Sequence, residues 1–105
     1  MSGYGHAVER LSQAILGTPG DLDPAIRTAI EAYAADLPER PRGIPPDLLP
    51  YVEKVARHAH TIVDADIERL RAAGFSEDAI LEATLAAALG AARGRLGRGL
   101  TALGG

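Results

Sequence analysis

The sequence predicts an all-α protein, a single domain over residues 1–105 built as a bundle of about five helices. Apolar residues make up 47% of the 105 residues, and alanine, leucine and isoleucine, which suit helices, supply most of them. They recur at helical spacing. Proline, glycine and capping residues divide the chain into segments of helix length. A chain this short builds one core rather than two.

Composition excludes several classes of function. The 14 acidic and 11 basic residues give a net charge of −3, which argues against binding nucleic acid through phosphate contacts. The chain has no cysteine, so it forms no disulfide and has no thiol nucleophile. The apolar run over 79–92 contains Glu82 and is shorter than a membrane span. The N-terminus lacks the apolar core of a signal peptide. We expect a cytoplasmic protein without membrane or nucleic-acid partners.

Three segments form the first half of the predicted fold. Residues 5–16 carry apolar residues at helical spacing and predict a short helix that, with the turn up to residue 20, is peripheral. Asp23 as N-cap and Pro24 at the first helical position predict a second helix that ends near Asp36. Residues 37–47 hold four of the seven prolines and predict a crossing loop. His6 suggests no role.

The middle of the chain can be interpreted in two ways. A helix opens near Asp47 and either continues through His60 or breaks between His60 and Val63. We favour the break, with Asp64 as the N-cap of a new helix over 65–73.

The next junction has the clearest signals in the sequence. Gly74 suits a left-handed helix end and Ser76 suits the N-cap of the following helix. Phe75 and Ile80 stand at the positions of a hydrophobic staple. These residues predict a tight turn between two helices.

The last helix carries two rows of small residues spaced by four. Such rows let helix backbones approach closely, either within the subunit or across a symmetric interface. The rows are Ala79, Ala83 and Ala87, and Ala86, Gly90 and Gly94.

The candidate site residues lie mainly in RHAHTIVDADIER, residues 57–69. In one continuous helix, Asp66 would lie within an apolar face, where burial raises the pKa of a carboxyl toward the range of a general acid or base. If the helix restarts at Asp64, both aspartates are ordinary first-turn residues, and we favour this alternative. His58 and His60 are two positions apart and point in nearly opposite directions on a helix, which argues against a metal site.

Glu82 is a further candidate because it interrupts an apolar helix. We expect it to face solvent or to pair with Arg69, Arg71 or Arg93, since a buried unpaired glutamate is costly.

The segment IERLRAAGFSEDAILEATLAAALGAA, and especially LRAAGFSEDAILEA within it, resembles the AhpD-like superfamily, which includes alkylhydroperoxidase AhpD and carboxymuconolactone decarboxylase. The resemblance covers roughly residues 24–103. It implies an all-helical, AhpD-like bundle that assembles as a trimer or hexamer. This gives the small-residue helix over 79–94 weight as a homo-oligomer interface.

The resemblance also implies where a redox centre would lie. Matched without gaps, the family's Cys-x-x-Cys falls on Ala59 and Ile62, its histidine on Asp66 and its upstream glutamate on Asp47. None of the four residues is the family's own. Thiol peroxidase and disulfide reductase chemistry require a thiolate and a resolving cysteine, so both activities are excluded.

Three functions remain. The first is a cysteine-less AhpD-like protein that serves as an oligomeric binding or accessory subunit, with a small molecule as its ligand. The second is a cofactor-independent, decarboxylase-like lyase in which Asp66, His58 or His60, and Glu82 line a pocket between helices. The third is a structural module without a site. No cofactor or metal is expected in any of them.

Overall fold

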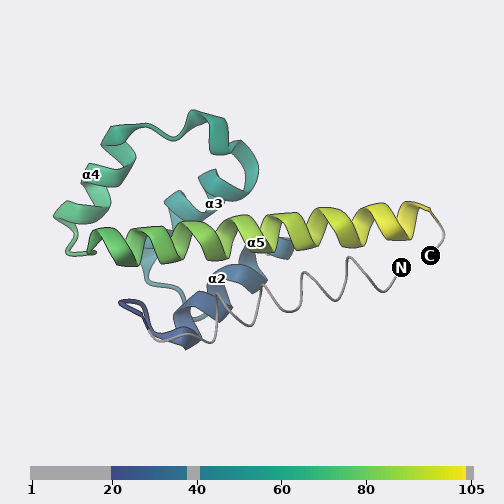
Figure 1. The fold of residues 1–105 in the computed structure, drawn as a ribbon, viewed down its shortest axis with the longest axis horizontal. Coiled ribbons are helices and arrows are strands. Elements are labelled where there is room, and N and C mark those ends of the chain that lie inside the picture. The colour runs from purple at the N-terminus through teal and green to yellow at the C-terminus, as the bar shows by residue number, and fades with distance from the viewer. Residues whose placement is uncertain (1–19, 38–40, 104–105) are drawn as a thin grey trace.

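The computed structural model describes residues 20–37 and 41–103, and over these ranges the chain is all-α, without strands. The elements are α2 (Pro24–Asp36), the 3₁₀ turn η1 (Pro46–Leu48), α3 (Leu49–His58), the 3₁₀ turn η2 (Ala59–Thr61), α4 (Asp64–Ala72) and α5 (Glu77–Ala102). The long helix α5 is central, with α2 on one side of it and α3 and α4 on the other (Figure 1). The described residues thus form a globule of four helices. The predicted helix over 5–16 and His6 lie outside them.

The predicted start of α2 is confirmed. The side chain of Asp23 accepts a hydrogen bond from the Ala25 N–H at 2.8 Å, and Pro24 occupies the first turn. The helix ends at Leu37, whose left-handed backbone (φ 47°) lets its N–H donate to the Tyr33 carbonyl. The chain then enters the proline-rich stretch, of which residues 38–40 lie outside the described part.

The small-residue rows of α5 pack against α2 within the same chain. Ala83, Ala86 and Ala87 are fully buried. At Gly90, an added Cβ would overlap the carbonyl oxygen of Glu31, so a glycine is needed for the two backbones to approach this closely. The rows therefore serve intramolecular packing, and the homo-oligomer stays a prediction that must rest on another face.

The break between α3 and α4 is confirmed, with its boundary moved by one residue. After η2 the backbone is extended at Ile62 and Val63. Val63, not Asp64, is the N-cap residue, and Asp66 provides the capping side chain by accepting from the Val63 N–H at 2.9 Å. Valine offers no acceptor in return, so this is one half of a capping box.

The turn from α4 to α5 matches its prediction. Gly74 has a left-handed φ of 104°. The N–H of Phe75 donates to the Leu70 carbonyl and that of Gly74 to the Arg71 carbonyl, the two bonds of a Schellman motif. Ser76 then caps α5 by accepting from the Ala79 N–H at 3.0 Å. Phe75 packs against the core that contains Ile80, as a hydrophobic staple requires.

The search for membrane spans among the described residues finds no helix with the length and apolar character needed to cross a bilayer.

Candidate functional site

Of the four candidate residues, one lines the pocket between α3 and α4. This residue is Asp66, whereas His58, His60 and Glu82 are absent from the lining. This pocket therefore contains one of the four residues predicted for a lyase, and not the two or more that the lyase prediction required.

The two histidines are exposed where α3 passes into η2. Their ring centroids lie 6.3 Å apart and the rings are nearly perpendicular. No group of three or more His, Cys, Asp or Glu side chains able to hold a metal ion occurs among the described residues.

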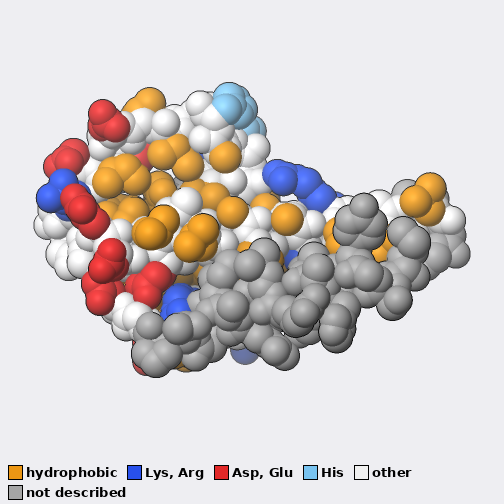
Figure 2. Space-filling view, in the orientation of Figure 1, with side chains coloured by type: hydrophobic (Ala, Val, Ile, Leu, Met, Phe, Trp, Pro, Cys, Tyr) orange, Lys and Arg blue, Asp and Glu red, His pale blue; other side chains and the backbone are white. Residues whose placement is uncertain are grey.

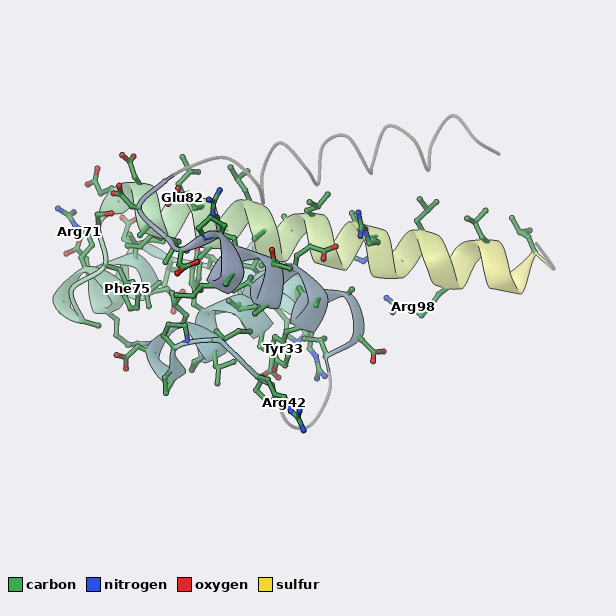
Figure 3. All side chains as sticks on the ribbon, turned by 90° about the horizontal axis from the view of Figure 1, so that it is seen from below. Tyr33, Arg42, Arg71, Phe75, Glu82 and Arg98 are labelled. Carbon is green, nitrogen blue, oxygen red and sulfur yellow. The ribbon has the colours of Figure 1, made fainter. Side chains whose placement is uncertain are left out.

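Glu82 has a structural role that the sequence did not suggest. Its carboxylate accepts hydrogen bonds from the backbone N–H groups of Asp21 and Leu22, both at 3.0 Å. It thereby holds the segment that leads into α2, as its position beside that segment shows (Figure 3). Glu82 is half-buried, and its carboxylate is held by these backbone groups, which the sequence analysis did not predict.

The sequence contains no indication of this role of Glu82, because its partners are backbone groups. The three arginines have other partners: Arg69 lies beside Asp66, Arg71 beside Glu68 and Glu77, and Arg93 beside Glu31. Backbone donors carry no mark in a sequence, so residue types alone could not identify them.

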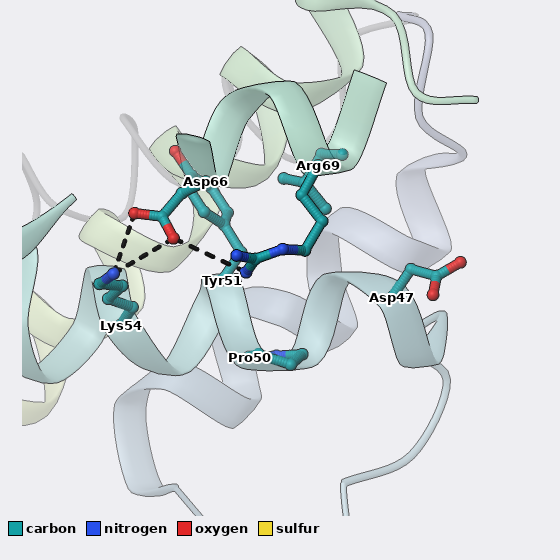
Figure 4. Close-up of a pocket in the computed structure, with 7 residues that line it drawn as sticks. Asp47, Pro50, Tyr51, Lys54, Asp66 and Arg69 are labelled. Carbon is teal, nitrogen blue, oxygen red and sulfur yellow. Dashed lines mark hydrogen bonds and ion pairs between the residues drawn. The ribbon is translucent and has the colours of Figure 1, made fainter. Parts of the chain in front are cut away.

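The pocket has a volume of about 210 Å³. Figure 4 shows the residues that line it. One wall is formed by α3 and the η1 turn that leads into it. Asp47 of η1 and Pro50, Tyr51 and Lys54 of α3 follow helical spacing and face the pocket together. Spacing of three and four on α4 brings Asp66, Arg69 and Leu70 to the other.

Asp66 is the electrostatic centre of this pocket. Its side chain is 10% exposed. The ammonium of Lys54 donates to both carboxylate oxygens, at 2.9 and 3.2 Å. The Nη1 of Arg69 lies 3.8 Å from Oδ1 of Asp66. The backbone N–H of Val63 donates a further hydrogen bond to the carboxylate. One nearly buried carboxylate thus faces two cations.

These contacts overturn the pKa shift expected for a continuous helix. The hydrogen bond from the Val63 backbone, followed by that from Lys54, lowers the pKa of Asp66 below its ordinary value, and these effects outweigh burial, which raises it. Asp66 is therefore a stable carboxylate at neutral pH. A general acid at this position would need the opposite shift.

A polar contact also fixes one wall of the pocket. The hydroxyl of Thr84 donates to the Ile80 carbonyl at 2.7 Å, so the Tyr51 hydroxyl, also 2.7 Å from the Thr84 oxygen, is the donor in that second bond. The Tyr51 ring is held between α3 and α5 and forms a rigid side of the pocket.

Sequence reasoning missed Lys54, Arg69 and Tyr51 as site residues. One signal was present: Lys54 is the only lysine in the chain, the other ten basic residues being arginines. Lysine presents a compact charge on a flexible stem, which suits contact with both oxygens of a carboxylate from a neighbouring helix.

The lowered pKa of Asp66 predicts a specific pH dependence. Because the carboxyl is a stronger acid in the folded state, its contribution to stability is complete above the unfolded-state pKa, near 4, and is lost as pH falls through the lower folded-state value. We expect the urea midpoint to fall on the acid side, and Asp66→Asn to make that fall smaller.

Asp64→Asn is the matched control, since it makes the same change at an exposed position two residues away. Equal acid sensitivity of Asp66→Asn and the unchanged protein would contradict the assignment.

Comparison of the chain with protein-family models, with curated proteins and with solved structures found no match.

Proposed function

We propose that this protein binds a small organic acid in the pocket between α3 and α4, as a cysteine-less, AhpD-like binding or accessory protein without thiol chemistry. The observation that carries the proposal is the pair of cations, Lys54 and Arg69, on opposite walls of the pocket around Asp66.

The charges favour an anionic ligand. Asp66 offsets one of the two cations and leaves the other available. Arg69 is the available one, because its side chain is 74% exposed and only 3.8 Å from Asp66, too far for a strong hydrogen bond. A guanidinium binds a carboxylate through two parallel hydrogen bonds, which gives it both affinity and orientation.

The remaining lining suits the rest of such a ligand. Pro50, Tyr51 and Leu70 offer apolar surface for a short hydrocarbon part. Asp47 is exposed on the wall formed by α3 and its leading turn, and it can accept from a ligand hydroxyl. A volume of about 210 Å³ is of the same order as the ~150 Å³ cavity that holds one benzene molecule, so the ligand is small.

One spatial relation supports the AhpD-like assignment. Asp47 and Asp66, which the resemblance matches with the family's glutamate and histidine, belong to different elements and yet line one pocket. Residues 19 positions apart need not meet, so their convergence supports a site at the location that the resemblance implies.

A decarboxylase-like lyase is the second candidate. Lys54 favours it, because an ammonium on the pocket wall could stabilise the charge that develops as CO₂ leaves and then protonate the carbanion. The histidines and Glu82 take no part in this version.

Binding is tested by titrating the protein with small mono- and dicarboxylates while the side-chain NMR signal of Lys54, the only lysine, is recorded. We expect saturable shifts, and an affinity reduced about 10- to 100-fold in Arg69→Gln, as for a lost charged hydrogen bond. Arg71→Gln is the matched control, since Arg71 lies on the same helix and pairs with Glu68 and Glu77 outside the pocket.

The outcomes separate the candidates. Saturable binding without CO₂ release from β-oxo acids supports a binding protein, and CO₂ release that Lys54→Met abolishes supports the lyase. Absence of binding by all the acids, or equal weakening in Arg71→Gln, would show that the pocket is not an anion site.

A further inference from the structure

One face of α5 is apolar, exposed and covered by no other described element. Leu81, Leu85, Ala88 and Ala92 recur at spacings of four, three and four, so they share one face. Leu81 is 55% and Leu85 43% exposed. Apolar side chains gather along α5 on the side turned to the viewer in Figure 2. We call these four residues the α5 stripe.

The stripe is bounded by opposite charges. Asp78 precedes it on the same face and Arg95 follows it, and both are exposed. One guanidinium nitrogen of Arg95, Nη2, donates to the Ala56 carbonyl of α3 at 3.1 Å, and an arginine has four further N–H groups with which to meet a carboxylate. The two charged residues between Asp78 and Arg95 point elsewhere: Glu82 to the segment before α2 and Arg93 to Glu31. The uncharged surface is therefore about 25 Å long at 1.5 Å per residue, acidic at one end and basic at the other.

We propose that the α5 stripe is the contact between two copies of this chain, which pair antiparallel about a two-fold axis between Ala86 and Ala87. This single axis places every stripe residue opposite a complementary one, and each contact occurs twice. The pairs are Asp78 with Arg95 of the partner subunit, Leu81 with Ala92 of the partner subunit, and Leu85 with Ala88 of the partner subunit.

The spacing makes the face complementary to itself. A two-fold interface uses the same surface on both subunits, so large residues must meet small ones and acids must meet bases. Here both leucines meet alanines, which lets the helices approach closely. A parallel pairing would instead place leucine on leucine and like charges at each end.

The size of the stripe sets the expected strength. The helix is 26 residues long, about 39 Å, but one helix face is small beside the ~800 Å² per partner of a standard interface. We therefore expect a dimer that dissociates on dilution. A hexamer with two-fold axes could contain the same contact, whereas a trimer could not.

Light scattering across a range of concentrations tests the assembly. We expect the unchanged protein to be a dimer or hexamer at about 100 µM and Leu85→Glu to weaken association at least 10-fold while the helical circular dichroism is kept. Ala32→Glu, the same charge added at an exposed position of α2, is expected to leave association unchanged. Monomers or trimers of the unchanged protein at this concentration would overturn the proposal.

Exchange of the charges identifies the register. Asp78→Arg and Arg95→Asp should each weaken association, and the double variant should restore it, because the proposed pairs are re-formed with reversed sign. Arg98→Asp is the matched control, since the Arg98 guanidinium also donates to a backbone carbonyl of its own chain, that of Ala35, as Arg95 does to that of Ala56, but Arg98 lies outside the proposed pairs. A double variant no stronger than the single ones would contradict the register.

Cross-linking tests the direction of the helices. The chain has no cysteine, so one introduced cysteine reports one position. With a short bis-maleimide, Ala88→Cys is expected to cross-link efficiently and Glu77→Cys is not, because antiparallel pairing separates the two copies of residue 77 by about 28 Å. Equal cross-linking at both positions would indicate a parallel pair and refute the axis. A monomer that binds a different protein through Leu85 would show that the stripe serves another partner.

Discussion

Gly90→Ala is expected to lower the free energy of unfolding by about 2 kcal/mol or more, although alanine is the better helix former. The new methyl group would overlap the Glu31 carbonyl oxygen and lie 3.0 Å from the Cβ of Ala34. Neither contact can move without shifting α2 away from α5. Overpacking of this kind typically costs about 1–3 kcal/mol, occasionally more, and outweighs the roughly 1 kcal/mol gained from helix propensity.

Gly97→Ala provides the matched control for this prediction. It lies on the same helix, but an added Cβ meets nothing within 4 Å. Here only the propensity term acts, so the variant should be more stable than the unchanged protein by up to about 1 kcal/mol. Urea denaturation of both variants measures the difference. If the two substitutions shift the midpoint in the same direction, the close approach of α2 and α5 is not what the structure describes.

Arg93→Met is expected to destabilise the protein by about 2–3 kcal/mol. Glu31 is buried in α2 with its side chain 8% exposed, and the Nε of Arg93 lies 3.2 Å from its Oε1. That oxygen accepts no hydrogen bond among the described residues, so the ion pair compensates its charge. Removal of one partner of a buried pair leaves an uncompensated charge and costs about 3–5 kcal/mol. We expect less because Arg93 is 35% exposed and water partly replaces it.

A double variant distinguishes loss of the ion pair from loss of packing. Arg93→Met combined with Glu31→Met replaces both charges by apolar side chains, and stability should return to near that of the unchanged protein. Arg98→Met is the control on the same helix, expected to change stability by less than about 0.5 kcal/mol because its contact with Ala35 is exposed and 3.4 Å long. A double variant as unstable as Arg93→Met would show that the charge of Glu31 is not the cause.

The elements that the sequence predicted well are those with local causes. Asp23, Pro24, Gly74 and Ser76 each act on backbone groups within a few positions of themselves, and all four are confirmed. The break after α3 was also predicted, but its boundary was one residue late. The reason is again local: the capping carboxylate comes from Asp66, inside the first turn, and not from the residue before the helix.

The candidate site was predicted less well. Asp66 was selected and does line the pocket, yet with a pKa shifted opposite to the one expected, because the Val63 N–H and Lys54 outweigh burial. Glu82 was selected for an unusual environment and has one, but its partners are the backbone N–H groups of Asp21 and Leu22. His58 and His60 have no place in the pocket.

The sequence by itself determined the helical class, the start of α2, the turn between α4 and α5 and the exclusion of thiol chemistry, since these depend on residue type and on neighbours within one or two turns. Only the tertiary structure decided which face of α5 packs on α2, that Lys54 pairs with Asp66, and that Glu82 holds a segment 61 residues away. These choices depend on how helices distant in the chain are packed together. Many arrangements satisfy the same apolar pattern, and the one adopted is selected by close contacts such as that of Gly90 with Glu31, which a linear pattern does not encode.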